Sequence, residues 1–137
     1  MVIAFLKMSP FHHKFRPKDT EIFERGGEYN GYVAFDAVLP LSYQGGADYT
    51  SNIADVLDGM IDVHGGITLD CSMEDMIEDP MIPLTAMPAP KELKKYRCIG
   101  FDTLHWNDTR EKWSIEAVKK ETLNLMKQIE TIIAEQK

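Results

Sequence analysis

The chain has 137 residues, of which 44% are hydrophobic and 27% charged, close to ordinary globular usage, so neither wholesale disorder nor a membrane protein is expected. Its formal net charge of −7 disfavours nucleic-acid binding, and it has no apolar run near the roughly 18 residues of a spanning helix. We therefore expect one domain over residues 1–137, without direct nucleic-acid contact and without a membrane segment.

The negative charge is concentrated in the middle of the chain. Between Arg25 and Lys91 there is no Lys or Arg. Eleven acidic residues lie in that interval: Glu28, Asp36, Asp48, Asp55, Asp58, Asp62, Asp70, Glu74, Asp75, Glu78 and Asp79. Three interpretations remain open, namely a solubilising surface, divalent cation binding, and an acidic face for a basic partner protein.

Two strands and a short helix are predicted in the first 60 residues. Residues 1–7 alternate weakly and indicate a strand, and residues 31–39 are rich in the aromatic and branched side chains that suit a sheet, until Pro40 ends the pattern. Apolar residues spaced as on a helix predict a short helix at 52–59.

The middle of the chain alternates between predicted strands and loops. Residues 63–70 indicate a short strand entered through a double glycine, and residues 97–104 indicate a central strand followed by a polar loop at 105–112. Four prolines between 73 and 90 make a regular element implausible there, so we expect a long, flexible Pro-rich loop at about 74–90 that can act as a lid.

The clearest element is a helix from Ser114 to about Glu135, with Ser114 as N-cap. Its apolar residues recur at steps of three and four: Ile115, Val118, Thr122, Leu125, Ile129 and Ile132. The whole pattern predicts an α+β fold, with a small antiparallel or mixed sheet and this long C-terminal amphipathic helix packed on one face. The near-heptad spacing is also compatible with a homo-oligomer contact.

The two cysteines, Cys71 and Cys98, do not have the spacing of metal ligands. Without an export signal, reduced core thiols are favoured over a disulfide, which favours the cytoplasm.

Two segments combine titratable side chains with features that strand packing does not require. In His64-Gly65-Gly66, the glycines allow positive φ or close approach of a ligand, although a tight turn beside a hydrogen-bonded histidine explains the same pattern. In residues 102–108, Asp102, His105 and Asp108 can form an acid/base pair or bind a divalent metal, although Asp and Asn are also ordinary turn formers.

These pieces carry a resemblance. Gly31-Tyr32-Val33, the His64-Gly65-Gly66 segment, the Gly-Phe-Asp-x-x-His-x-x-Asp motif at 100–108, and a helix with Glu121, Leu125 and Gln128 resemble a family of small phage and prophage proteins of unassigned activity. The resemblance implies phage origin, a location in the host cytoplasm, and a shared role for the His and Asp residues of the two motifs. Where the family pattern often has a cysteine, this chain has Thr103, which argues against a cysteine nucleophile.

Whether the protein is an enzyme stays open at this stage. One hypothesis is a hydrolase acting on a phosphorylated or nucleotide-like small molecule, with catalytic residues His64, Asp102, His105 and Asp108 converging on substrate or on a divalent metal. A second is a non-catalytic binder that sequesters a host nucleotide signal in the same pocket. Its ligand-binding residues would be Gly65, Gly66, Tyr32 and Trp106. The third is an acidic interaction protein or nucleic-acid mimic that inhibits a host protein.

The sheet arrangement decides whether these residues can meet. If the strands carrying His64 and Asp102 are antiparallel neighbours, the start of one and the end of the other lie at the same sheet edge. We therefore expect His64, Asp102 and His105 to line a single pocket on one rim of the sheet.

Overall fold

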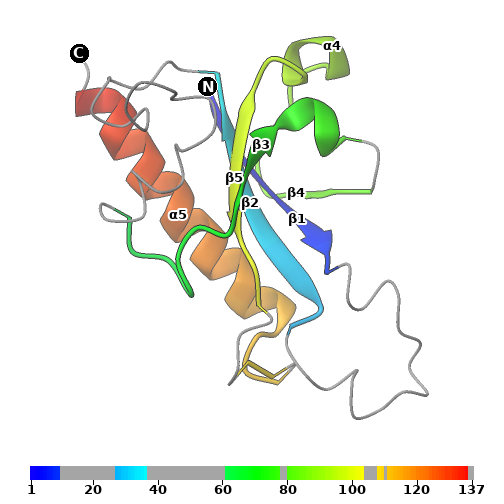
Figure 1. Cartoon of the computed structure of the whole chain (residues 1–137), viewed down its shortest axis with the longest axis vertical. Helices are drawn as coiled ribbons and strands as arrows, with labels where there is room; N and C mark the ends of the chain where they lie inside the picture. Colours follow the sequence, from blue (N-terminus) through cyan, green and yellow to red (C-terminus); the bar gives the residue numbers. More distant parts are fainter. Residues whose placement is uncertain (10–26, 37–60, 78–79, 104–107, 110, 136–137) are drawn as a thin grey trace.

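The computed structural model describes residues 1–9, 27–36, 61–77, 80–103, 108–109 and 111–135. Its elements in chain order are β1 (Val2–Met8), β2 (Tyr29–Phe35), β3 (Leu69–Ser72), the 3-10 helix η2 (Met73–Asp75), β4 (Ile82–Pro83), α4 (Pro90–Leu93), β5 (Arg97–Phe101) and α5 (Ile115–Glu135). The predicted helix at 52–59 lies outside the described residues. Figure 1 shows α5 lying along one side of the sheet, which confirms the α+β fold.

The five strands form one sheet in the order β3-β5-β2-β1-β4. Every neighbouring pair is antiparallel: β1 with β2, β1 with β4, β2 with β5, and β3 with β5. The central pairing joins Val33 of β2 to Ala4 on one side and to Ile99 on the other. These residues are fully buried, so the middle of the sheet forms the centre of the core.

Helix α5 covers one face of the sheet, as its periodicity predicts. Its buried residues are Val118, Thr122, Leu125, Ile129 and Ile132. They pack with Leu6, Phe35, Phe101 and other side chains of that sheet face in one apolar cluster. The side chain of Ser114 accepts a hydrogen bond from Ala117 N at 3.3 Å, which confirms Ser114 as the N-cap.

A glycine sets how closely α5 approaches the sheet. A Cβ at Gly31 would overlap Oγ1 of Thr122 on α5 and lie 2.6 Å from the ring of Phe101. Only glycine therefore fits at this contact between β2 and the helix.

The Pro-rich segment and the residues that flank it cover the opposite face of the sheet, where Met73 and Met76 are buried in a second apolar cluster with Phe5 and Tyr32. Most of the described residues of 74–90 have no regular structure, as expected, but the end of η2, the two-residue strand β4 and the start of α4 lie among them. Two of the prolines occupy positions that need no backbone donor. Pro90 is in the first turn of α4, and Pro83 lies in a two-residue edge strand.

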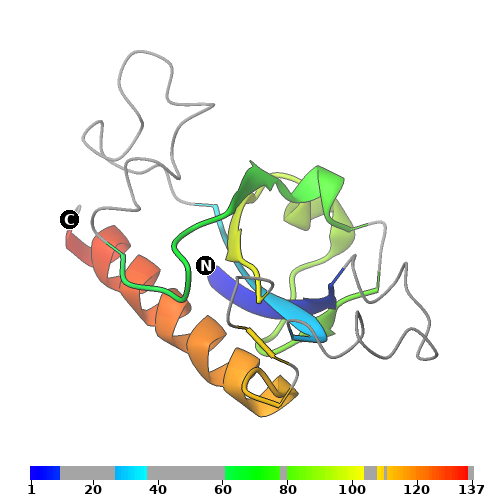
Figure 2. The same cartoon turned by 60° about the horizontal axis from the view of Figure 1, so that its bottom comes forward.

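The strand predicted at 63–70 is also corrected. Strand β3 begins only at Leu69. The preceding residues 61–68, called here the His64 segment, run beside α5 (Figure 2).

Candidate functional site

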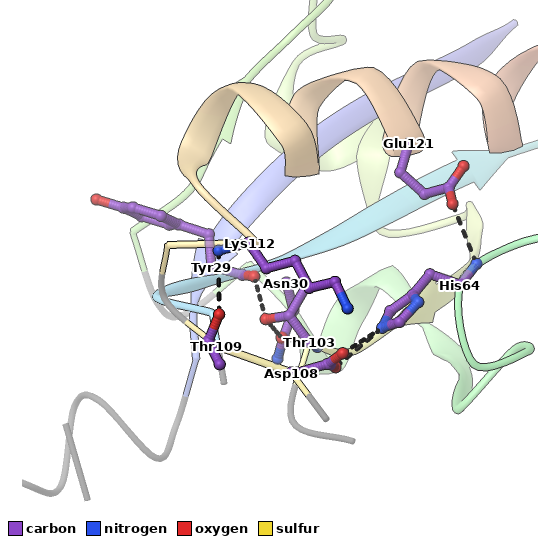
Figure 3. Close-up of polar contacts among 8 residues, drawn as sticks. All are labelled: Tyr29, Asn30, His64, Thr103, Asp108, Thr109, Lys112 and Glu121. Carbon is purple, nitrogen blue, oxygen red and sulfur yellow. Dashed lines mark hydrogen bonds and ion pairs between the residues drawn. The ribbon is translucent and has the colours of Figure 1, made fainter. Parts of the chain in front are cut away.

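The central feature of the site is a contact between His64 and Asp108. Nε2 of His64 lies 2.9 Å from both carboxylate oxygens of Asp108 (Figure 3). The Asp108 side chain is 4% exposed and the His64 side chain 24% exposed. Because a carboxylate oxygen accepts hydrogen bonds, Nε2 of His64 is the donor in this pair. We call this contact the His64–Asp108 pair.

The backbone around His64 is held by polar side chains of α5 instead of by a neighbouring strand. Gln128 accepts a hydrogen bond from Asp62 N through Oε1 at 2.8 Å and donates one to Asp62 O through Nε2 at 2.8 Å. Asn124 also donates to Asp62 O, at 3.3 Å, and Glu121 accepts from His64 N at 3.2 Å. The side-chain amide of Gln128 thus satisfies both backbone groups of one residue, as a partner strand would, and fixes the start of the His64 segment on the helix.

The imidazole of His64 also packs on an aromatic ring. Its centroid lies 4.1 Å from that of Trp113, with 37° between the ring planes. Trp113 in turn contacts Phe101 at the end of β5, with ring centroids 6.4 Å apart. Trp113 therefore anchors the imidazole against the sheet. Sequence reasoning missed this residue, although an aromatic residue just before the N-cap of a core helix was an available signal.

Hydrogen bonds fix the chain on both sides of residues 104–107. On one side, Thr103 donates through Oγ1 to Tyr29 O at 2.8 Å and through its backbone N–H to Oδ1 of Asn30 at 3.1 Å. On the other, Thr109 accepts through Oγ1 from Lys112 N at 3.1 Å and through its carbonyl from Trp113 N at 2.9 Å. The chain that carries Asp108 is thereby tied to the start of β2 and to the start of α5 (Figure 3).

The predicted catalytic residues are only partly brought together. The structure pairs His64 with Asp108, whereas His105 lies outside the described residues. Asp102 follows β5 and is not a member of the His64–Asp108 pair. Burial, and to a smaller extent the charge of Asp102, raise the pKa of the Tyr32 phenol, which belongs to the cluster on the face opposite α5.

The predicted ligand-binding residues are placed differently from the expectation. Gly65 and Gly66 have positive φ values of 69° and 78°, and Gly66 N donates to Val63 O at 2.9 Å, so the pair forms a tight turn directly after His64. Tyr32 is 7% exposed and stacks on Phe5 with ring centroids 5.3 Å apart, which makes it a core residue. Trp106 lies outside the described residues.

Some of the acidic residues in the middle of the chain have positive partners. Asp70 forms an ion pair with Arg97 on the neighbouring strand, and Asp36 accepts a hydrogen bond from the N-terminal amine at 2.8 Å. These two carboxylates are therefore compensated, although no Lys or Arg is near them in the sequence. Among the residues that the structure describes, no group of three or more His, Cys, Asp or Glu side chains is arranged to hold a metal ion.

A groove borders the other side of Trp113. It has a volume of about 430 Å³ and is lined by Glu28, Tyr29, Trp113, Ser114 and Ile115. Small-molecule sites commonly have volumes of about 300–1,000 Å³. Trp113 thus both lines this groove and contacts the imidazole of His64.

Fold and site together define an α+β domain with a histidine–carboxylate pair between the sheet edge and a long helix. No family model, curated protein or solved structure matches the chain. The resemblance to a phage family therefore stays a prediction. In the described part of the chain, no helix is long and apolar enough to cross a membrane.

Proposed function

We propose that the protein is a hydrolase of nucleotide-like small molecules in which His64 is the general base and Asp108 its positioning residue. The observation that carries this proposal is the contact of both Asp108 oxygens with Nε2 of His64 at 2.9 Å. A buried carboxylate on one ring nitrogen fixes the tautomer and stabilises the imidazolium that forms when the other nitrogen takes a proton. In this proposal the imidazole of His64 would remove the proton from an attacking water.

Preorganisation supports a catalytic role for this histidine. The imidazole is restrained by Asp108 at its edge and by Trp113 on its face, while Glu121 holds its backbone N–H. A ring restrained in this way needs little reorientation before proton transfer, which is the arrangement that general-base catalysis requires.

The groove beside Trp113 supports an aromatic substrate. Tyr29 and Trp113 both line it, and aromatic side chains of this kind stack on a nucleobase in a sequence-tolerant way. Glu28 also lines the groove, and Glu121 lies beside His64, so the local charge disfavours a bare phosphate. A phosphorylated substrate would therefore enter as its complex with a divalent cation.

The test is turnover of a defined panel. Purified protein is incubated with nucleoside mono-, di- and triphosphates and with cyclic nucleotides, each with Mg²⁺, with Mn²⁺ or with a chelator, and products are separated by chromatography. If hydrolysis is found, His64→Ala should lower kcat by about 10²–10⁴-fold and Asp108→Asn by a smaller factor, with KM little changed in both. Asp75→Asn is the matched control, because Asp75 is an exposed carboxylate next to the opposite sheet face.

The proposal fails if no member of the panel is hydrolysed, or if His64→Ala retains wild-type kcat while folded. Loss of activity in all three variants alike would point to destabilisation instead of catalysis. Circular dichroism of each variant separates these outcomes.

The groove itself favours a second candidate, a non-catalytic binder of a nucleotide-like ligand. In this case the ligand occupies the space between Tyr29 and Trp113 without being turned over. Isothermal titration with the same panel would show stoichiometric binding that Trp113→Ala abolishes and His64→Ala does not. Binding that depends on His64 and is followed by product release would favour the hydrolase.

A further inference from the structure

The two cysteines lie opposite each other on neighbouring strands, away from α5. Cys71 of β3 pairs directly with Cys98 of β5 in the antiparallel register, and both are free thiols. Directly opposite residues of antiparallel strands have Cα atoms about 4.5–5.5 Å apart, within the range of about 4.4–6.8 Å found for disulfides. The backbone therefore already holds the two thiols at a separation that a disulfide can span.

The two thiols differ in exposure and in acidity. Cys98 is fully buried, whereas Cys71 is partly exposed at the sheet edge. The hydrogen bond from the Cys98 thiol lowers the pKa of Cys71, against the raising effects of burial, Asp75 and Asp70 and with help from Arg97. Burial holds the pKa of Cys98 well above its ordinary value. A more acidic, partly exposed thiol beside a buried one matches the division of roles between an attacking and a resolving cysteine.

We propose that Cys71 and Cys98 form a reversible oxidation site at which a hydroperoxide reacts with Cys71 and Cys98 completes an intramolecular disulfide. The Cys71 thiolate attacks the peroxide, so that an S–O bond forms, the O–O bond breaks, and the leaving oxygen departs as water or an alcohol after taking up a proton. The Cys98 thiol then attacks this sulfur. An S–S bond forms, the S–O bond breaks, and the hydroxide leaves as water with the Cys98 proton.

Two thiols are thus oxidised by two electrons and one peroxide is reduced. A dithiol reductant reverses the reaction by thiol–disulfide exchange.

The disulfide would fasten an edge strand. Among the described strands, β3 is at one end of the sheet and pairs only with β5, and η2 follows it directly. The bond would close a loop that contains η2, β4 and α4, and Met73 of η2 and Leu93 of α4 belong to the second apolar cluster. Oxidation therefore acts on the layer opposite α5, and it is independent of the proposed hydrolase function.

The experiment uses the full reduced chain and hydrogen peroxide as the probe. After treatment at neutral pH, the protein is denatured, its remaining thiols are labelled with a maleimide, and the intact mass and the linked peptides are determined. The wild type should lose both thiols, yield a Cys71–Cys98 peptide, and recover both thiols with dithiothreitol. In Cys98→Ser, Cys71 should stop at the sulfenic acid, which dimedone traps. In Cys71→Ser, Cys98 should react at least about tenfold more slowly than Cys71 does in the wild type.

The proposal would be overturned by a wild type that keeps both thiols, by a disulfide that links two chains, or by fast oxidation of Cys98 in Cys71→Ser. Because Cys98 is a core residue, Cys98→Ala is made alongside Cys98→Ser, and the variant with native circular dichroism is used. In that variant, a Cys71 that stays unmodified while the wild type is oxidised would equally refute attack at Cys71.

Discussion

Replacing His64 with alanine should destabilise the fold measurably, because the imidazole contacts a buried partner. The lost hydrogen bond to the ionised Asp108, whose side chain is 4% exposed, costs about 1.5–3 kcal/mol. Loss of the ring contact with Trp113, at 4.1 Å between centroids, adds about 0.5–1.5 kcal/mol. We therefore expect the free energy of unfolding to fall by about 2–4 kcal/mol.

The assay is urea unfolding of the wild type, His64→Ala, Asp108→Ala and the double variant at neutral pH. A direct contact predicts that the double variant is more stable than the sum of the single effects implies, with a coupling energy of about 1–3 kcal/mol. His64→Phe is the matched control, because it keeps a ring against Trp113 and removes the hydrogen bond. Single effects that add to within about 0.5 kcal/mol would show that the His64–Asp108 pair does not form in solution.

Two further predictions concern the core. Gly31→Ala should reduce stability by about 1–3 kcal/mol in urea unfolding, because the added methyl group overlaps Thr122, and adding Thr122→Ala should relieve part of the loss. A Gly31→Ala variant as stable as the wild type would contradict this close contact. Burial raises the pKa of Tyr32 above its usual 10.0, so the neutral phenol is favoured in the folded protein. The wild type should therefore keep its full stability below about pH 10 and lose stability above it, as the unfolded phenol ionises before the folded one. Between about pH 8 and 11 the urea midpoint of the wild type should fall relative to that of Tyr32→Phe, and a constant difference would refute the assignment.

The sequence pattern predicted a regular element well where apolar residues repeat over several helical turns, as in α5, or where the strand is central in the sheet, as in β5. Helix α5 begins one residue after its predicted cap, and the strand predicted at 97–104 is β5, which ends at Phe101. The short elements within the Pro-rich segment were not predicted, because the number of prolines was weighed without their positions. Pro83 in an edge strand and Pro90 in a first helical turn both leave the local structure intact.

The candidate site was predictable only in part. The sequence singled out His64 and Asp108 from separate motifs, but 44 residues separate them, and no spacing rule shows that they touch. The apolar character of residues 63–70 suggested a strand. The prediction failed at residues 63–68 because side chains of a distant helix, which a local pattern cannot reveal, bind the backbone at the start of this segment. Gln128 takes the place of a neighbouring strand at Asp62, which is a tertiary interaction invisible to local propensity.

The position of α5 after all five strands has a consequence for the nascent chain. During synthesis, β1, β2 and β5 leave the ribosome before the helix that covers their apolar face. Until Leu125 and Ile129 have emerged, side chains such as Val33 and Phe101 have no helix to pack against. A ribosome that stalls between β5 and the end of α5 would therefore present a paired but uncovered sheet, a surface that chaperones bind and that associates with other such chains.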